Sequence, residues 1–201
     1  MRADAIVFGI AGALFGIIVG WVLGTQQATT SARLAAPVAQ SAPAQQQSAA
    51  PQAAAIDPER VKALEDLAAK NPNDVQPRVQ LGNIFFDGEK YADSITWYEQ
   101  ALKINPNDTN VSTDLGVAYY YTNQPDKALS QFDHSLSIDP KHIKTLLNVG
   151  IVRAFGKQDF AGAAKAWQQV VDLAPNSPEG QAAKKGLEGI KSAHPEAGGA
   201  K

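Results

Sequence analysis

With 201 residues and a formal net charge of −2, the chain is long enough for one ordinary domain and some additional segments. It has no cysteine, which excludes disulfides, a thiol nucleophile, thiolate metal ligands and a lipid-modified cysteine anchor. From residue 57 onward there are 16 basic and 19 acidic side chains, so the chain lacks the basic surface of a nucleic-acid-binding protein.

After a short flank, 1–4, an uncharged and largely apolar stretch predicts a transmembrane helix over 5–24. The 19 residues from Ala5 to Leu23 would span roughly 28 Å as a helix, close to the thickness of the hydrocarbon core. A cleaved signal peptide is the alternative, with a cleavage site between Ala28 and Ala32. We expect a retained anchor, because the apolar core is longer and the start less basic than in such signals.

Positive charge near this helix predicts its orientation. Arg2 and the α-amine precede the helix, whereas only Arg33 follows it within the distance over which positive charge matters. We therefore expect the N-terminus to stay inside and the rest of the chain to be translocated. In a bacterium this is a single-pass protein of the inner (cytoplasmic) membrane with a periplasmic domain.

Glycines recur at every fourth position of the predicted membrane helix: Gly12, Gly16, Gly20 and Gly24. Positions four apart lie on one helix face, and glycine there permits close approach of a second helix. We expect this face to contact another membrane helix or a second copy of the chain. The competing interpretation is that glycine is simply frequent in membrane helices.

Residues 25–56 consist almost wholly of Ala, Gln, Ser, Thr and Pro. This composition cannot bury a core, and Pro37, Pro43 and Pro51 interrupt any helix. The segment is predicted to be a disordered linker between the anchor and the remainder.

From residue 57 onward the sequence is charged, periodic and repetitive. A glycine preceded by Leu or Val recurs at intervals of 34 residues: Gly82, Gly116 and Gly150. A proline that follows an apolar run recurs at intervals of 34, 34 and 35: Pro72, Pro106, Pro140 and Pro175. The extra residue of the last interval is expected in the turn over 157–161.

These positions resemble the tetratricopeptide repeat (TPR), whose pattern has Leu-Gly, then aromatic and small residues, then Pro. Three repeats match it, at 75–108, 109–142 and 143–177. The chain departs from the pattern at Arg153, which replaces an aromatic residue, and in lacking the family's early Trp. The resemblance implies an all-α solenoid of helical hairpins, a TPR domain over 57–193.

Two further helices, 57–71 and 178–192, are expected to cap the ends of the array, and the tail 194–201 is expected to fray. One hairpin cannot bury its own apolar face, so stacking about three of them creates a continuous core. The Gly lets the first helix of a hairpin approach the aromatic residue of the second, and the Pro ends the second helix.

The resemblance also implies that an inner face, lined by first helices, binds the partner. The candidate groove residues are Val79, Asn83, Phe86, Val117, Tyr120, Tyr121, Lys144, Leu147, Ile151 and Phe155. This set is unusually apolar and aromatic for a surface, and exposed aromatic patches mark interfaces. The competing interpretation is that some of these residues pack beneath the helices at the ends of the array.

One TPR subclass grips an acidic C-terminal carboxylate of chaperones with five polar residues. The corresponding positions here are Val79, Asn83, Asp114, Lys144 and Asn148. Only Asn83 and Lys144 match, and Asp114 would repel a carboxylate. We therefore expect a more apolar ligand, extended or helical.

The sequence predicts no catalytic, metal or cofactor site. The three histidines, His134, His142 and His194, show no metal-ligand spacing and are interpreted as solvated. We expect a non-catalytic scaffold or assembly factor for a protein or peptide partner, similar to the membrane-anchored TPR proteins of bacterial cytochrome c biogenesis, some of which handle apocytochrome chains. The alternative is a fixed subunit of a larger membrane complex, docked through the glycine face.

Overall fold

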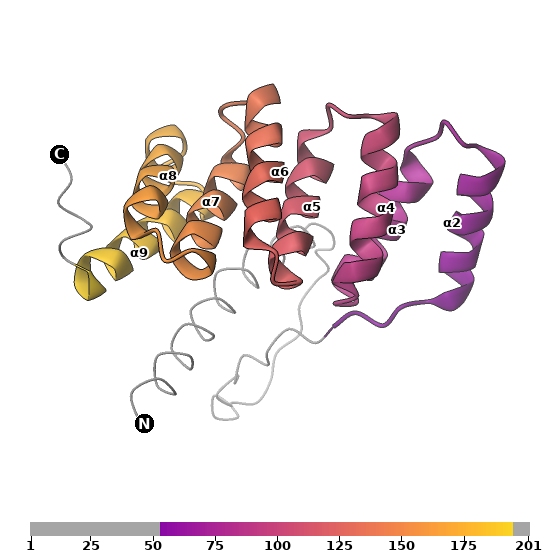
Figure 1. The fold of residues 1–201 in the computed structure, drawn as a ribbon, viewed down its shortest axis with the longest axis horizontal. Helices are drawn as coiled ribbons and strands as arrows, with labels where there is room; N and C mark the ends of the chain where they lie inside the picture. The colour runs from indigo at the N-terminus through magenta and orange to yellow at the C-terminus, as the bar shows by residue number, and fades with distance from the viewer. Residues whose placement is uncertain (1–52, 195–201) are drawn as a thin grey trace, which may run out of the picture. The chain divides into compact units, whose positions relative to one another are not determined.

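The computed structural model describes residues 53–194, and this part of the chain is an array of eight α-helices without strands (Figure 1). The predicted all-α solenoid is thereby confirmed. The helices are α2 (Pro58–Lys70), α3 (Gln76–Asp87), α4 (Tyr91–Ile104), α5 (Thr109–Tyr121), α6 (Pro125–Ile138), α7 (Ile143–Ile151), α8 (Phe160–Leu173) and α9 (Pro178–Ala193), with a π-helical turn η2 (Val152–Gly156) after α7.

The predicted membrane anchor with its glycine face, most of the predicted linker and residues 195–201 of the predicted tail lie outside the described residues. Within 53–194, no helix has the length and apolarity needed to cross a bilayer. The end of the predicted linker contacts the first hairpin: the Ala54 N–H donates to the Asp87 carbonyl at 2.9 Å. Ile56 packs over Gly88: a Cβ added to Gly88 would lie 2.6 Å from Cδ1 of Ile56.

Glycine and an aromatic ring meet inside each hairpin. A Cβ added to the glycine would collide with the ring in all three cases: Gly82 with Tyr98, Gly116 with Phe132 and Gly150 with Trp167. The three rings are at most 2% exposed. The two helices of a hairpin thus approach so closely that the ring fills the space that a side chain on the first helix would need.

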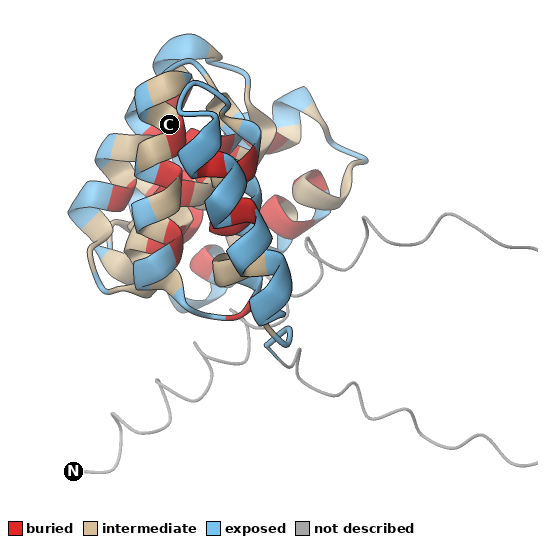
Figure 2. Ribbon diagram, turned by 90° about the vertical axis from the view of Figure 1, so that its right-hand side faces the viewer, coloured by how far each residue is buried: buried red, intermediate tan, exposed pale blue. Residues whose placement is uncertain are grey.

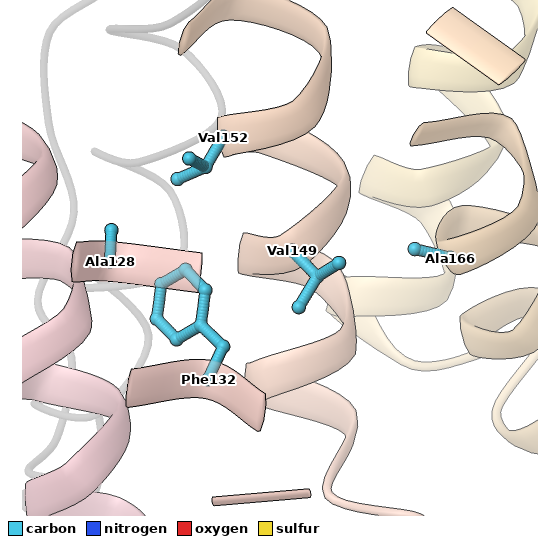
Figure 3. Close-up of a cluster of buried hydrophobic side chains, with 5 residues drawn as sticks. All are labelled: Ala128, Phe132, Val149, Val152 and Ala166. Atoms are coloured by element: carbon cyan, nitrogen blue, oxygen red, sulfur yellow. The ribbon is translucent and has the colours of Figure 1, made fainter. Parts of the chain in front are cut away.

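Apolar side chains also join one hairpin to the next. Figure 3 shows one such cluster, formed by Ala128, Phe132, Val149, Val152 and Ala166. A view from the α2 end shows buried residues between the helices and exposed residues along their outward surfaces (Figure 2). Because each hairpin shares its core with its neighbours, the array gains stability by stacking.

Side chains complete the helix ends. Asp108 accepts hydrogen bonds from the N–H groups of Asn110 and Val111 at 3.1 and 3.0 Å, as an N-cap of α5. Arg78, at the position of the family's Trp, donates to the Ala68 carbonyl at 3.0 Å. It therefore ties the C-terminal end of α2 to α3, where α2 has free carbonyl groups.

The extra residue of the third repeat lies in the helix and not in the turn. The first two hairpins turn at Glu89 and Asn123, with φ of 58° and 59°, and the third turns at Gln158, with φ of 55°. Gln158 follows its repeat glycine by eight residues, one more than in the other hairpins. The π-helical turn η2 absorbs the addition, with the Lys157 N–H donating to the Val152 carbonyl at 3.1 Å. The predicted location in 157–161 is wrong by a few residues.

A buried polar cluster joins the second hairpin to the third. Thr113, Ser135 and Thr145 are 0% exposed. The Thr113 and Thr145 hydroxyls are 2.6 Å apart, and both lie within hydrogen-bond distance of the Ser135 hydroxyl, at 3.2 and 3.0 Å. The Nδ1 atom of His142 lies 2.6 Å from the Thr145 hydroxyl. Burial lowers the pKa of His142 below its ordinary value, so the prediction of a solvated histidine is wrong at this position.

Candidate partner-binding face

The predicted groove residues come from the first helices of the three hairpins. We call the surface formed by α3, α5, α7 and η2 the inner face. Val79, Asn83 and Phe86 belong to α3, and Val117, Tyr120 and Tyr121 belong to α5. Lys144, Leu147 and Ile151 belong to α7, and Phe155 to η2.

Two of these predicted residues are buried in the structure. Leu147 and Ile151 are 2% and 4% exposed, because α7 packs against both α8 and α9. Val79 and Val117 are half-buried and pack against the clusters between hairpins. The helix at the C-terminal end therefore covers part of the predicted groove, as the competing interpretation holds. Phe86, Tyr120, Tyr121 and Lys144 are also half-buried, and Asn83 and Phe155 are exposed.

An aromatic cluster lies where α3, α4 and α5 meet. The rings of Tyr91 and Tyr121 stack with centroids 4.4 Å apart and planes 8° apart. The Phe86 ring lies edge-on to both, at centroid distances of 5.3 Å from Tyr91 and 6.1 Å from Tyr121. Burial raises the pKa of Tyr121 further above neutral pH. The cluster offers aromatic faces beside polar hydroxyl groups, a composition typical of binding surfaces.

Tyr91 was not among the predicted residues. It is the first residue of α4, directly after the turn of the first hairpin. The expected groove comprised only first-helix positions, so it omitted a residue at the start of a second helix. The signal that could have found it is an aromatic residue next to the turn, which brings its side chain back toward the end of α3.

A polar group of residues lies beside the aromatic cluster. The Tyr98 hydroxyl donates to Oδ1 of Asn83 at 2.8 Å, and the Lys144 ammonium contacts the Asp114 carboxylate at 2.7 Å. Burial, and then the nearby Asp114, raises the pKa of Asp87. Burial also raises the pKa of Asp114, although Lys144 opposes this shift. Two carboxylates on α3 and α5 thus lie close to one another with one lysine between α5 and α7.

A pocket on a different surface lies between α4, α5 and α6. Tyr119 lines it, donates to Oε1 of Glu99 at 2.5 Å and has the ammonium of Lys127 5.3 Å from its ring centroid. Gln131 and His134, which also line this pocket, have hydrogen-bond partners within the protein. No group of three metal-ligating side chains occurs in the described part of the chain.

At the C-terminal end, His194 does not behave as a solvated tail residue. Its ring stacks on Phe160 with centroids 3.9 Å apart and planes 17° apart. The interpretation of His194 as a fraying, solvated residue is therefore wrong. His134 is exposed, with Nε2 2.9 Å from the Pro106 carbonyl oxygen.

Comparisons with known proteins support the repeat. A family model described as TPR repeat matches residues 82–123, and one described as tetratricopeptide repeat matches residues 111–142. No match was found among curated proteins.

Solved structures share the helical array. The crystal structure of MamA is 17% identical and superposes with a TM-score of 0.59, covering 68% of this chain and 80% of MamA. The Sgt2 TPR domain from Aspergillus fumigatus is 28% identical with a TM-score of 0.52, covering 71% of this chain and 83% of its own. The first TPR of Spaghetti (RPAP3), bound to the HSP90 peptide SRMEEVD, is 22% identical with a TM-score of 0.52. The match covers 69% of this chain and 95% of the Spaghetti domain. Residues 82–142 therefore carry tetratricopeptide repeats, and the helices around them continue the TPR fold.

Proposed function

We propose that the chain is a non-catalytic scaffold that holds a protein or peptide partner on its inner face. The observation that carries this proposal is the aromatic cluster of Phe86, Tyr91 and Tyr121 beside the polar side chains of Asn83 and Asp87. Rigid aromatic residues with adjacent polar groups contribute most of the energy at many protein interfaces.

The fold itself supports peptide binding. The structure of Spaghetti (RPAP3) holds an HSP90 peptide on a TPR domain. TPR arrays are protein-interaction scaffolds, and their stacked helices expose long surfaces that match extended or helical ligands. The same role in this chain requires no cofactor and no reacting group.

We also propose that the scaffold is tethered to the inner (cytoplasmic) membrane through residues 5–24, with the TPR domain in the periplasm. The apolar length of 5–24 and the charges around it support this location. The organisation predicted from the sequence resembles that of some cytochrome c biogenesis factors, and we propose an unfolded apocytochrome chain as one class of partner.

Site-specific photocrosslinking tests the binding face. A photoreactive phenylalanine at Asn83, which is exposed on α3, should yield a discrete adduct with one partner in cells. The matched control places the same group at Asp133, an exposed residue of the second helix α6. Adducts of equal yield at both positions, or none at Asn83, would contradict the proposal.

The glycine spacing in 5–24 favours a second role, as a fixed subunit of a membrane complex docked through Gly12, Gly16, Gly20 and Gly24. Blue-native gels of mildly solubilised membranes distinguish the two roles. A fixed subunit co-migrates with one complex, and Gly16→Leu should release it. A scaffold that binds partners transiently should migrate separately in both forms.

A further inference from the structure

The inner face carries an uneven set of charges. Asp87 and Asp114 supply two carboxylates beside the aromatic cluster, and Lys144 on α7 supplies one positive charge. Lys144 already pairs with Asp114 at 2.7 Å. Within the described residues, the Asp87 carboxylate has no ion pair and accepts no side-chain hydrogen bond. Beside the aromatic cluster, the described part of the chain therefore leaves the Asp87 carboxylate without a charged partner.

We infer that the inner face selects a partner segment with a basic side chain, Lys or Arg, which binds Asp87 beside the aromatic cluster. This inference rests on the proposed function and adds the chemistry of the partner. A cation placed there relieves the repulsion between Asp87 and Asp114, whereas an anion increases it.

The aromatic cluster favours the same ligand. Phe86 adjoins Asp87 in α3, and its ring contacts Tyr91 and Tyr121. Glu89 lies close enough to raise the pKa of both tyrosines, so a second carboxylate borders the cluster. Aromatic faces attract ammonium and guanidinium groups, and they also pack against the aliphatic stem of Lys or Arg.

Asn83 adds a contact for the backbone of the ligand. Its Oδ1 accepts from the buried Tyr98 hydroxyl, which orients the amide group so that its NH₂ is directed away from Tyr98. Asn83 is exposed, so this NH₂ can donate to a peptide carbonyl. The site thus combines one backbone contact with a subsite for a basic side chain, as expected for recognition of an extended peptide.

Peptide selection tests the inference directly, because it works before any natural partner has been identified. A phage library of random 12-residue peptides is selected on the full-length chain in detergent micelles, and in parallel on the variants Asp87→Asn and Asp133→Asn. Asp87→Asn removes the charge with little change of shape. Asp133→Asn is the matched control, because it removes an equal charge from α6. We expect Lys or Arg enrichment on the parent and on Asp133→Asn, and its loss on Asp87→Asn.

Affinity measurements then sharpen the result. The best selected peptide is compared by fluorescence polarisation with a version in which its basic residue is replaced by Gln. On the parent chain we expect binding to weaken at least about fivefold, and on Asp87→Asn by less than about twofold.

The outcomes separate this inference from the proposed function. Selected peptides without basic residues, or basic peptides that bind Asp87→Asn as well as the parent, would overturn the inference and leave the scaffold function standing. No selection of any peptide above background would overturn both. Circular dichroism of each variant confirms that the fold is unchanged.

Discussion

The junction between the first two hairpins and the junction between the last two use equivalent repeat positions for different chemistry. The first junction places three apolar residues at these positions: Val79, Ala101 and Val111. The second places three hydroxyl-bearing residues there: Thr113, Ser135 and Thr145. Each pair of equivalent residues has a similar size, so the same backbone arrangement accepts either set.

The difference teaches that the repeat specifies shape more strictly than polarity. A buried hydroxyl is tolerated when it has a partner, and in the described part of the chain every buried side-chain nitrogen or oxygen atom has one. The polar junction is therefore stable as a complete set, and the apolar junction needs no partners at all. Changing one member of the polar set should have a different effect from changing all three.

The largest expected effect comes from the hairpin that both junctions share. In Gly116→Leu the new side chain collides with the Phe132 ring, which separates α5 from α6 and disturbs both junctions. We expect the free energy of unfolding to fall by about 3 kcal/mol or more, measured by urea denaturation of the full chain in detergent. The control is Gly189→Ala in α9, where no atom lies within 4 Å of the added Cβ. Its stability should be equal to the parent's or up to about 1 kcal/mol higher.

The polar junction should be sensitive to a single change. Thr113→Val removes a hydroxyl that Ser135 and Thr145 both contact, and leaves two buried groups with fewer partners. We expect a loss of about 2 kcal/mol in the free energy of unfolding, again by urea denaturation. A Thr113→Val chain as stable as the parent would show that the cluster does not act as a unit.

The polar junction should tolerate a complete exchange. The triple variant Thr113→Val, Ser135→Ala, Thr145→Val gives it the composition of the first junction. No buried hydroxyl then lacks a partner, and only Nδ1 of the half-buried His142 loses one, so we expect stability within about 1 kcal/mol of the parent. The decisive comparison is with Thr113→Val alone. A triple variant less stable than this single variant would mean that the repeat specifies polarity as well as shape at the second junction.

The smallest effect is a dependence on pH at the polar junction. Burial lowers the pKa of His142, so the unfolded chain binds the proton more readily than the folded one. The stability from neutral His142 is fully present above about pH 6.5 and is lost as pH falls below it, levelling off below the lowered pKa. Asp139, Asp114 and Asp108 favour the charged form, whereas Lys144 disfavours it. The melting temperature should fall between about pH 7.5 and 5.5, and His142→Gln should reduce that fall.

The sequence was sufficient to predict the repeat because the 34-residue period follows from contacts that each hairpin makes. A glycine and an aromatic residue, such as Gly116 and Phe132, recur at fixed positions because each glycine must leave room for a ring in its own hairpin. The same logic could not locate the extra residue of the third repeat. The interval between Gly150 and Pro175 shows that this repeat has one residue more than the others. Only the backbone shows whether that residue lies in a helix or in a turn.

The candidate face was less predictable than the fold. Leu147 occupies an inner position of its repeat, but its burial depends on helices of the third hairpin and the C-terminal end, which a repeat pattern does not describe. Tyr91 was omitted because it lies in a second helix. The polar cluster was missed because Ser135 matches the repeat as a small residue, and its partners come from two other helices.

The π-helical turn η2 has a consequence for how such arrays diversify during evolution. The added residue leaves the spacing from Gln158 to Ala163 equal to that from Asn123 to Ala128, so the second helix keeps its packing. It changes the side chains at the end of the first helix, where Phe155 is 36% exposed. Gain or loss of a single residue there alters the groups that one repeat presents to a ligand while the core is inherited unchanged.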